Sequence, residues 1–208
     1  MSLRRDKRLR QALRPERGRG AGSETGDGRL SQPVGERDHA LGAEDAPITL
    51  VVYGDYLCPR TRQAWPLVEE LLEELGDRLR VVWRHFPLPE RVETQTRAQR
   101  TAEAAEAAEA QSRFWEMHEA LFEASQVIED EHLVRYAAAR AGLDRRRFEQ
   151  HVERRVHAGM VLKDLASGLA SGVRKTPAFF VNGVRHDESY LLRVVLAGAW
   201  ESATTERA

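Results

Sequence analysis

The sequence of 208 residues contains a single cysteine, Cys58, and this scarcity limits its chemistry at once. One cysteine excludes a disulfide within the chain and a zinc site built from several thiolates. Nothing in the use of cysteine requires an oxidising compartment. Any thiol chemistry of this chain must therefore take place at Cys58.

Long apolar runs and an excess of one charge are also missing. Lys and Arg number 32 and Asp and Glu 33, and this balance argues against a dedicated nucleic-acid-binding protein. The basic N-terminus MSLRRDKRLRQALRPERGRG lacks the apolar stretch of a secretory signal. No run approaches the roughly 18 apolar residues that span a bilayer. We therefore expect a cytoplasmic globular protein without a transmembrane segment, of unknown oligomeric state.

Residues 1–45 differ in composition from the rest of the chain. Arg, Gly, Ser and acidic residues dominate there, and apolar residues are too few to offset the entropy lost on ordering. The stretch predicts a disordered basic and polar tail, with order beginning near residue 46.

Strand, helix and strand patterns then follow one another closely. Residues 48–54 (ITLVVYG) are apolar and β-branched, as is typical of a buried strand. From Pro59, apolar residues recur at intervals of three and four, which predicts an amphipathic helix that ends at Gly76. Strand character returns at 78–86. This βαβ unit predicts two parallel strands.

The middle of the chain is helical, and strand character returns near its end. The helical patterns cover residues 92–112, 113–124, 130–142, 143–156 and 159–170. Residues 177–186 predict a hairpin with a two-residue Asn182-Gly183 turn, and residues 189–200 predict a last amphipathic helix.

This order of elements resembles the thioredoxin fold in its DsbA-like form, in which a helical domain is inserted between two halves. The motifs GDYLCPRT, FWEMHEALF and KTPAFFVNG carry the resemblance, which extends to thioredoxin-type domains that stand alone or are appended to sodium/proton antiporters. It implies an α/β thioredoxin fold (βαβ…ββα) with halves at 46–90 and 173–203 and an all-helical insertion at 91–172.

Cys58 lies where the first predicted strand meets its helix. A thiol at a helix N-terminus faces unpaired N–H groups and the positive end of the helix dipole, and both favour the thiolate. Pro59 removes one of these N–H groups and fixes the helix entry, while Arg60 and Arg62 add positive charge. We predict a nucleophilic thiolate; an inert buried cysteine is the alternative.

Thr61 occupies the position at which the DsbA-like motif C-P-x-C has its second cysteine. It lies one helical turn from Cys58, so its hydroxyl could donate a hydrogen bond to the sulfur. The resemblance further implies a cis Thr176–Pro177 bond against the sulfur, with Thr176 offering backbone groups to a substrate. A trans proline at a strand start is the alternative.

Because the second thiol of the motif is missing, the resemblance implies a more limited set of reactions than disulfide donation by a thiol pair. A mixed disulfide at Cys58 would have to be resolved by an external thiol, such as glutathione or another small thiol, acting as a co-substrate. The expected partners are protein or small-thiol disulfides, with no tightly bound cofactor. A sulfenic-acid sensor, a redox-silent protein-binding module and a glutathione-type transferase remain alternatives.

Three other polar residues invite a functional interpretation. His118 could act as a base, but its aromatic neighbours at helical spacing favour a packing role, and His85 is expected to be structural. Asp55 favours turn chemistry over proton transfer. No group of His, Cys, Asp and Glu has the spacing of a metal site, so no metal is expected.

Overall fold

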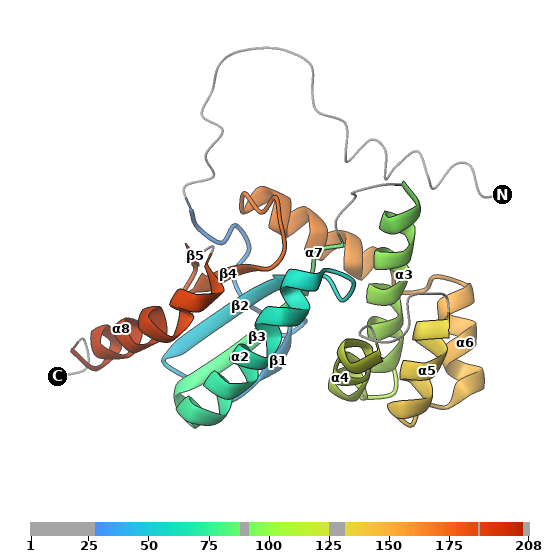
Figure 1. The fold of residues 1–208 in the computed structure, drawn as a ribbon, viewed down its shortest axis with the longest axis horizontal. Helices are drawn as coiled ribbons and strands as arrows, with labels where there is room; N and C mark the ends of the chain where they lie inside the picture. Colours follow the sequence, from blue (N-terminus) through green and yellow to red (C-terminus); the bar gives the residue numbers. More distant parts are fainter. Residues whose placement is uncertain (1–27, 88–91, 125–131, 187, 206–208) are drawn as a thin grey trace, which may run out of the picture.

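A five-stranded sheet forms the centre of the computed structural model, which describes residues 28–87, 92–124, 132–186 and 188–205 (Figure 1). Its strands lie in the order β1-β3-β2-β4-β5. They comprise β1 (His39–Leu41), β2 (Ile48–Gly54), β3 (Leu79–His85), β4 (Ala178–Val181) and β5 (Val184–His186). Only β2 and β3 pair in parallel; the other neighbours are antiparallel. The α/β thioredoxin fold is thereby confirmed.

The βαβ unit places Cys58 at the carboxyl end of the parallel strands. Helix α2 (Pro59–Leu75) connects β2 to β3 and ends at Gly76, whose φ of 53° is readily adopted by glycine. The parallel register runs from Ile48 beside Leu79 to Gly54 beside His85. The carboxyl ends of both strands, and the loop that leads to Cys58, therefore lie together.

The second half of the fold places Pro177, which directly precedes β4, at the same end of the sheet as Cys58. Strand β4 pairs antiparallel with β2, and Tyr53 lies opposite Ala178. The predicted turn between β4 and β5 is confirmed, with Asn182 and Gly183 at φ of 48° and 80°, as a type I′ turn requires. The start of β4 consequently lies beside the segment that follows β2.

Order begins earlier than the sequence pattern indicates. Strand β1 pairs with β3, and Arg29 bridges Val184, so the expectation of a disordered tail is wrong for residues 28–45. A three-residue strand is too short to show a period, and it forms because β3 offers it a neighbour. Residues 1–27 of the predicted tail lie outside the described residues.

Helices cover both faces of the sheet. On one face, α2 and α8 (Leu192–Thr205) pack against side chains such as Leu50 and Val52. On the other, α7 (Ala158–Ala170) packs against Tyr53 and Phe86. Gly54 is required at the end of β2, because a Cβ there would lie 2.1 Å from the Trp83 ring.

The remaining helices form a bundle beside the carboxyl ends of β2 and β3 (Figure 1). It contains α3 (Val92–Glu109), α4 (Phe114–Ala124), α5 (His132–Arg140) and α6 (Arg145–Glu153). Because α7 covers the sheet, the helical insertion expected at 91–172 includes one helix that belongs to the sheet's core. The predicted boundary at 90–91 lies outside the described residues. Among the helices of the described chain, none has the length and apolar character needed to span a membrane.

Candidate functional site

Cys58 is the N-cap residue of α2. Its backbone is extended, with φ of −78° and ψ of 118°, and its carbonyl oxygen accepts the first helical bond from the Arg62 N–H at 3.1 Å. Pro59 follows as the first helical residue, where its missing N–H costs nothing. The half-buried thiol makes no capping hydrogen bond to the helix, so its sulfur is positioned for other partners.

The sulfur contacts the segment that precedes β4. Cys58 Sγ lies 3.4 Å from the carbonyl oxygen of Thr176, to which the thiol donates a long, weak hydrogen bond. The Thr176–Pro177 peptide bond is cis. Residues 118 positions apart in the sequence thus form one small site at the edge of the sheet.

The two threonines of the site contribute buried hydroxyls that have no hydrogen-bond partner. Thr61 and Thr176 are 1% and 2% exposed, and the Oγ1 atoms of both are unpartnered. The hydrogen bond expected from the Thr61 hydroxyl to the Cys58 sulfur is not formed within the described part of the chain, where the thiol itself donates to the Thr176 carbonyl. Unpaired buried hydroxyls are costly, about 1–3 kcal/mol each, so these two are unused hydrogen-bond donors of the site.

The loop that leads into the helix is fixed by Asp55. Its carboxylate Oδ1 accepts the N–H of Leu57 at 2.9 Å, and its carbonyl accepts the N–H of Cys58 at 3.0 Å. The predicted turn role of Asp55 is confirmed. Arg60 is exposed on the first turn of α2, two residues after Cys58.

His118 packs behind the site instead of reaching the sulfur. It is fully buried, its Nδ1 lies 2.9 Å from the Tyr56 hydroxyl, and burial lowers the pKa of its imidazole well below the usual value. Burial likewise raises the pKa of Tyr56, so both groups are neutral and the phenol donates to Nδ1. The His118 ring packs edge-on against the Trp65 ring, with centroids 4.4 Å apart, and its Nε2 has no hydrogen-bond partner among the described residues. The favoured packing role of His118 is confirmed.

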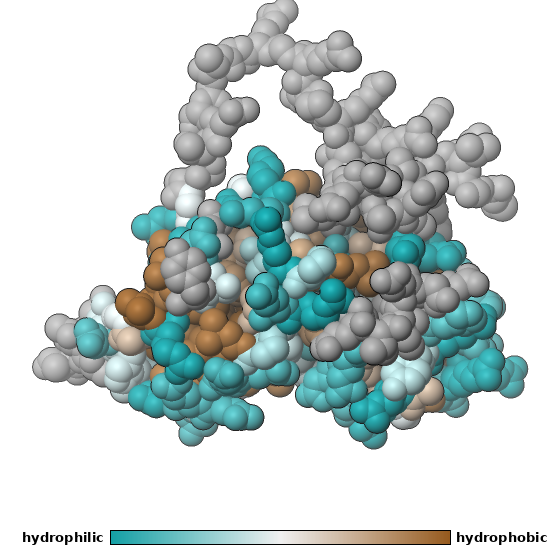
Figure 2. Space-filling view, viewed as in Figure 1, coloured by the Kyte–Doolittle hydropathy of each residue, from teal (hydrophilic) through white to brown (hydrophobic). Residues whose placement is uncertain are grey.

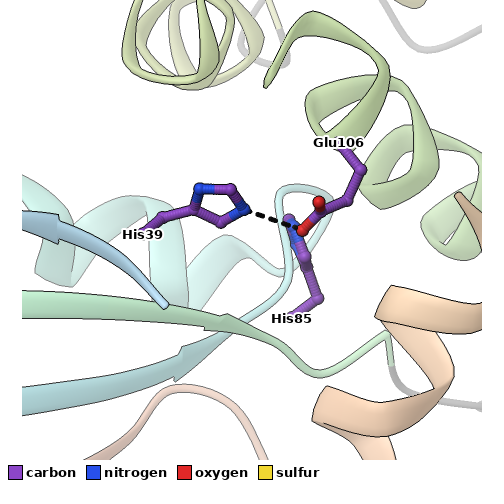
Figure 3. A group of neighbouring side chains, drawn as sticks. All are labelled: His39, His85 and Glu106. Carbon is purple, nitrogen blue, oxygen red and sulfur yellow. Dashed lines mark hydrogen bonds and ion pairs between the residues drawn. The ribbon is translucent and has the colours of Figure 1, made fainter. Parts of the chain in front are cut away.

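A second polar group lies near the carboxyl end of β3 and was not identified from the sequence. His39 of β1 and His85 of β3 both point at the Glu106 carboxylate from α3 (Figure 3). Oε1 of Glu106 lies 2.9 Å from His39 Nε2 and 3.1 Å from His85 Nε2. Burial alone would raise the pKa of Glu106, but these two hydrogen bonds hold it well below its usual range.

The three side chains place their ligand atoms within 4.8 Å of one another, the spacing of a metal site. The Trp83 indole, which can only donate, lies 3.1 Å from His85 Nδ1. Because Nδ1 must then be the acceptor, the neutral His85 ring carries its proton on Nε2 and donates it to Glu106. A metal at Nε2 would need a fully deprotonated ring, so the arrangement fits a hydrogen-bonded cluster better than a metal centre.

The cluster could not be predicted from the sequence, because its members come from three separate elements. Positions 39, 85 and 106 have no common spacing, and His39 lies in a strand that has no periodic signal. Its ring stacks on Phe114 of α4, with centroids 3.4 Å apart. The motif RHF at the end of β3 was the one available signal, since a histidine at a strand end faces the helices that follow.

The fold and the site define a class of protein: a thioredoxin-fold domain with a cysteine at the start of the helix after the central β strand and a helical insertion. The sequence matches the Thioredoxin family over residues 35–192, and the chain belongs to that family.

Longer proteins contain similar sequences. The chain is 41% identical over 172 residues to "Na(+)/H(+) antiporter NhaA 3" of Salinispora tropica and 42% identical over 179 residues to "Na(+)/H(+) antiporter NhaA 1" of Mycolicibacterium vanbaalenii. These matches cover 83% and 82% of this chain but only 26% and 28% of the relatives. The chain thus spans about a quarter of the length of the curated relatives that it matches.

Solved structures of DsbA-like proteins share the fold. Alpha-DsbA1 of Wolbachia pipientis superposes with a TM-score of 0.71 at 21% identity, covering 86% of this chain and 98% of that one. BdbD of Bacillus subtilis gives a TM-score of 0.67 at 20% identity, covering 86% and 94%. At these identities the likeness establishes the fold, and the activity is argued below from the site.

Proposed function

We propose that this protein is a thiol–disulfide oxidoreductase of the monothiol type, which forms mixed disulfides at Cys58 that an external small thiol resolves. The observation that carries the proposal is the placement of Cys58. Its half-buried sulfur lies at the N-terminus of α2, 3.4 Å from the Thr176 carbonyl oxygen, with Thr61 where a second thiol would stand.

The reaction consists of two exchanges that leave the protein unchanged. In the first, the Cys58 thiolate attacks one sulfur of a substrate disulfide; a new S–S bond forms, the old one breaks, and the released thiolate takes a proton from water. In the second, the thiolate of a small thiol attacks the substrate sulfur of the mixed disulfide. Cys58 leaves as a thiolate, and the substrate sulfur is now joined to the small thiol.

Each neighbour of Cys58 has a part in this scheme. The N–H groups of the first turn of α2 stabilise the thiolate, and Pro59 sets the direction of that turn. The unpartnered hydroxyls of Thr61 and Thr176 supply donors for a thiolate or a mixed disulfide. Thr176 and Pro177 form the wall against which a substrate sulfur lies, and Arg60 attracts anionic substrates.

Intact-mass measurement after incubation with oxidised glutathione tests the proposal. We expect one adduct on the wild type, none on Cys58→Ser, and release of the adduct by reduced glutathione. We also expect Cys58 to be alkylated at neutral pH about tenfold faster than a cysteine in an unstructured peptide.

Two results would replace the proposal. Absence of an adduct, together with slow alkylation, would leave the redox-silent binding module, for which Cys58→Ser retains full function. Protein-dependent conjugation of glutathione to an electrophile, without disulfide exchange, would favour the transferase.

A further inference from the structure

A groove with a volume of about 650 Å³ begins at Leu57, the residue directly before the nucleophile. It runs between the start of α2 and three helices of the insertion, with Arg100 of α3, Val134 of α5 and Phe148 of α6 among its lining residues. This volume lies within the range of small-molecule sites. A molecule bound in the groove would therefore contact the residue that directly precedes Cys58.

The floor of the groove is apolar. Phe148 is buried, while Leu57, Val134 and Val152 are partly buried and pack against the main core. These side chains belong to three different elements, so the floor is held by the tertiary packing of the insertion on the sheet. Such a floor can receive the methylene and backbone portions of a ligand.

The rim of the groove carries an excess of positive charge. Arg97 and Arg100, one turn apart on α3, and Arg135 of α5 line it as exposed side chains that make no side-chain hydrogen bond or ion pair within the described part of the chain. Arginine binds carboxylates through two parallel hydrogen bonds, and a cleft lined by one sign of charge concentrates oppositely charged ligands. In the view of Figure 2, the surface over α5 and α6 is largely hydrophilic.

The wall formed by α6 is different. Arg145 pairs with Glu149 at 2.9 Å, which leaves Glu153 on the next turn with no side-chain partner among the described residues. Four arginines and two glutamates line the groove in total. It thus offers several sites for carboxylates and one for an ammonium group.

We propose that this groove binds the small-thiol co-substrate, and that this co-substrate is a peptide-like thiol with carboxylates and an α-ammonium group, as in glutathione. The inference rests on the proposed monothiol function and specifies its resolving thiol. Carboxylates lie against Arg97, Arg100 and Arg135, the ammonium group faces Glu153, and the thiol reaches past Leu57 to Cys58. An acidic protein segment is disfavoured, because the volume suits a small molecule.

Competing disulfides of different charge test the groove. The rate of adduct formation at Cys58 is followed by intact mass with oxidised glutathione and with the neutral 2-hydroxyethyl disulfide, at low and high salt. We expect the double variant Arg97→Ala/Arg100→Ala to slow the glutathione reaction about tenfold at low salt and to leave the hydroxyethyl reaction unchanged. Arg146→Ala, an exposed arginine of α6 outside the groove, is the matched control and changes neither rate.

The outcomes separate this inference from the function on which it rests. If both disulfides form adducts at rates that the double variant does not change, the groove is not the co-substrate site. Monothiol exchange at Cys58 would remain supported. No adduct from either disulfide would overturn the proposed function itself. An acidic peptide that blocks the glutathione reaction at lower concentration than reduced glutathione would overturn the small-molecule occupant. Arg135→Ala, on a separate helix, repeats the test should the double variant fail to fold.

Discussion

Two polar regions lie near the carboxyl ends of β2 and β3: the Cys58 site and the cluster of His39, His85 and Glu106. They differ in how far their polar groups are satisfied by hydrogen bonds. In the cluster, both histidine Nε2–H groups donate to one carboxylate oxygen, and Trp83 donates to His85 Nδ1. At Cys58, one long hydrogen bond is formed and two threonine hydroxyls have no partner.

This difference separates a hydrogen-bonded structural cluster from a site that retains unused hydrogen-bond donors. The cluster connects β1, β3 and α3 through charge-assisted hydrogen bonds, and such bonds stabilise the folded state. At the Cys58 site, the buried hydroxyls of Thr61 and Thr176 are unused donors within the described chain, and this lowers stability. Mutations in the two regions should therefore affect different measurements.

The largest expected effect comes from Thr61→Cys, which would supply the missing resolving thiol. Residues three apart in a helix have Cα atoms about 5 Å apart, within the range of a disulfide. We expect oxidised glutathione to yield an internal disulfide in place of the adduct, as measured by intact mass. Thr61→Ser is the control and should keep the adduct; an unchanged adduct on Thr61→Cys would show that residue 61 does not face the sulfur.

Glu106→Gln should cost stability without altering the reaction at Cys58. A neutral amide weakens both hydrogen bonds from the histidines, and we expect a loss of about 3 kcal/mol in the free energy of unfolding. Urea denaturation measures the loss. Glu109→Gln, a half-exposed neighbour 3.9 Å from His39 Nδ1, should lose less than about 0.5 kcal/mol. Equal losses from both variants would contradict the structural role of the cluster.

The smallest expected effect is a pH dependence of the free energy of unfolding that arises from Asp164. Burial raises the pKa of this carboxyl to about 6, only partly offset by the His85 N–H that lies 2.9 Å from its Oδ2. The folded state then holds a proton that the unfolded state has released, so stability falls as pH rises between about 4 and 6. Asp164→Asn should remove about 2 kcal/mol of this decline. Urea denaturation across the same pH range measures it, and parallel profiles for variant and wild type would refute the assignment.

Much of the fold could be predicted because its signals are local. The apolar run before Cys58, the amphipathic period of α2 and the Asn182-Gly183 turn each specify their element within a few residues. The N-cap of α6 is just as local, since the carboxylate of Asp144 accepts the N–H of Arg147 at 2.8 Å. The position of Cys58 and Pro59 at the start of α2 could be predicted for the same reason.

Strand β1 and the bond pattern around the sulfur could not be predicted. The strand depends on a partner about 40 residues further along the chain, because three residues carry no period of their own. The Thr61 hydroxyl has the right spacing to reach Cys58, yet it has no partner among the described residues, and the thiol donates to Thr176 from the other half of the fold.

The sequence by itself determined the class of the fold, the position of the only thiol and the absence of a second thiol at position 61. The tertiary structure alone decided which groups surround that sulfur, how His39, His85 and Glu106 meet, and where the arginines of α3 and α5 face α6. The physical reason is range. Helix caps, turns and periods act over a few residues, whereas a site and a groove require side chains from distant segments to converge, and only the packed chain fixes that convergence.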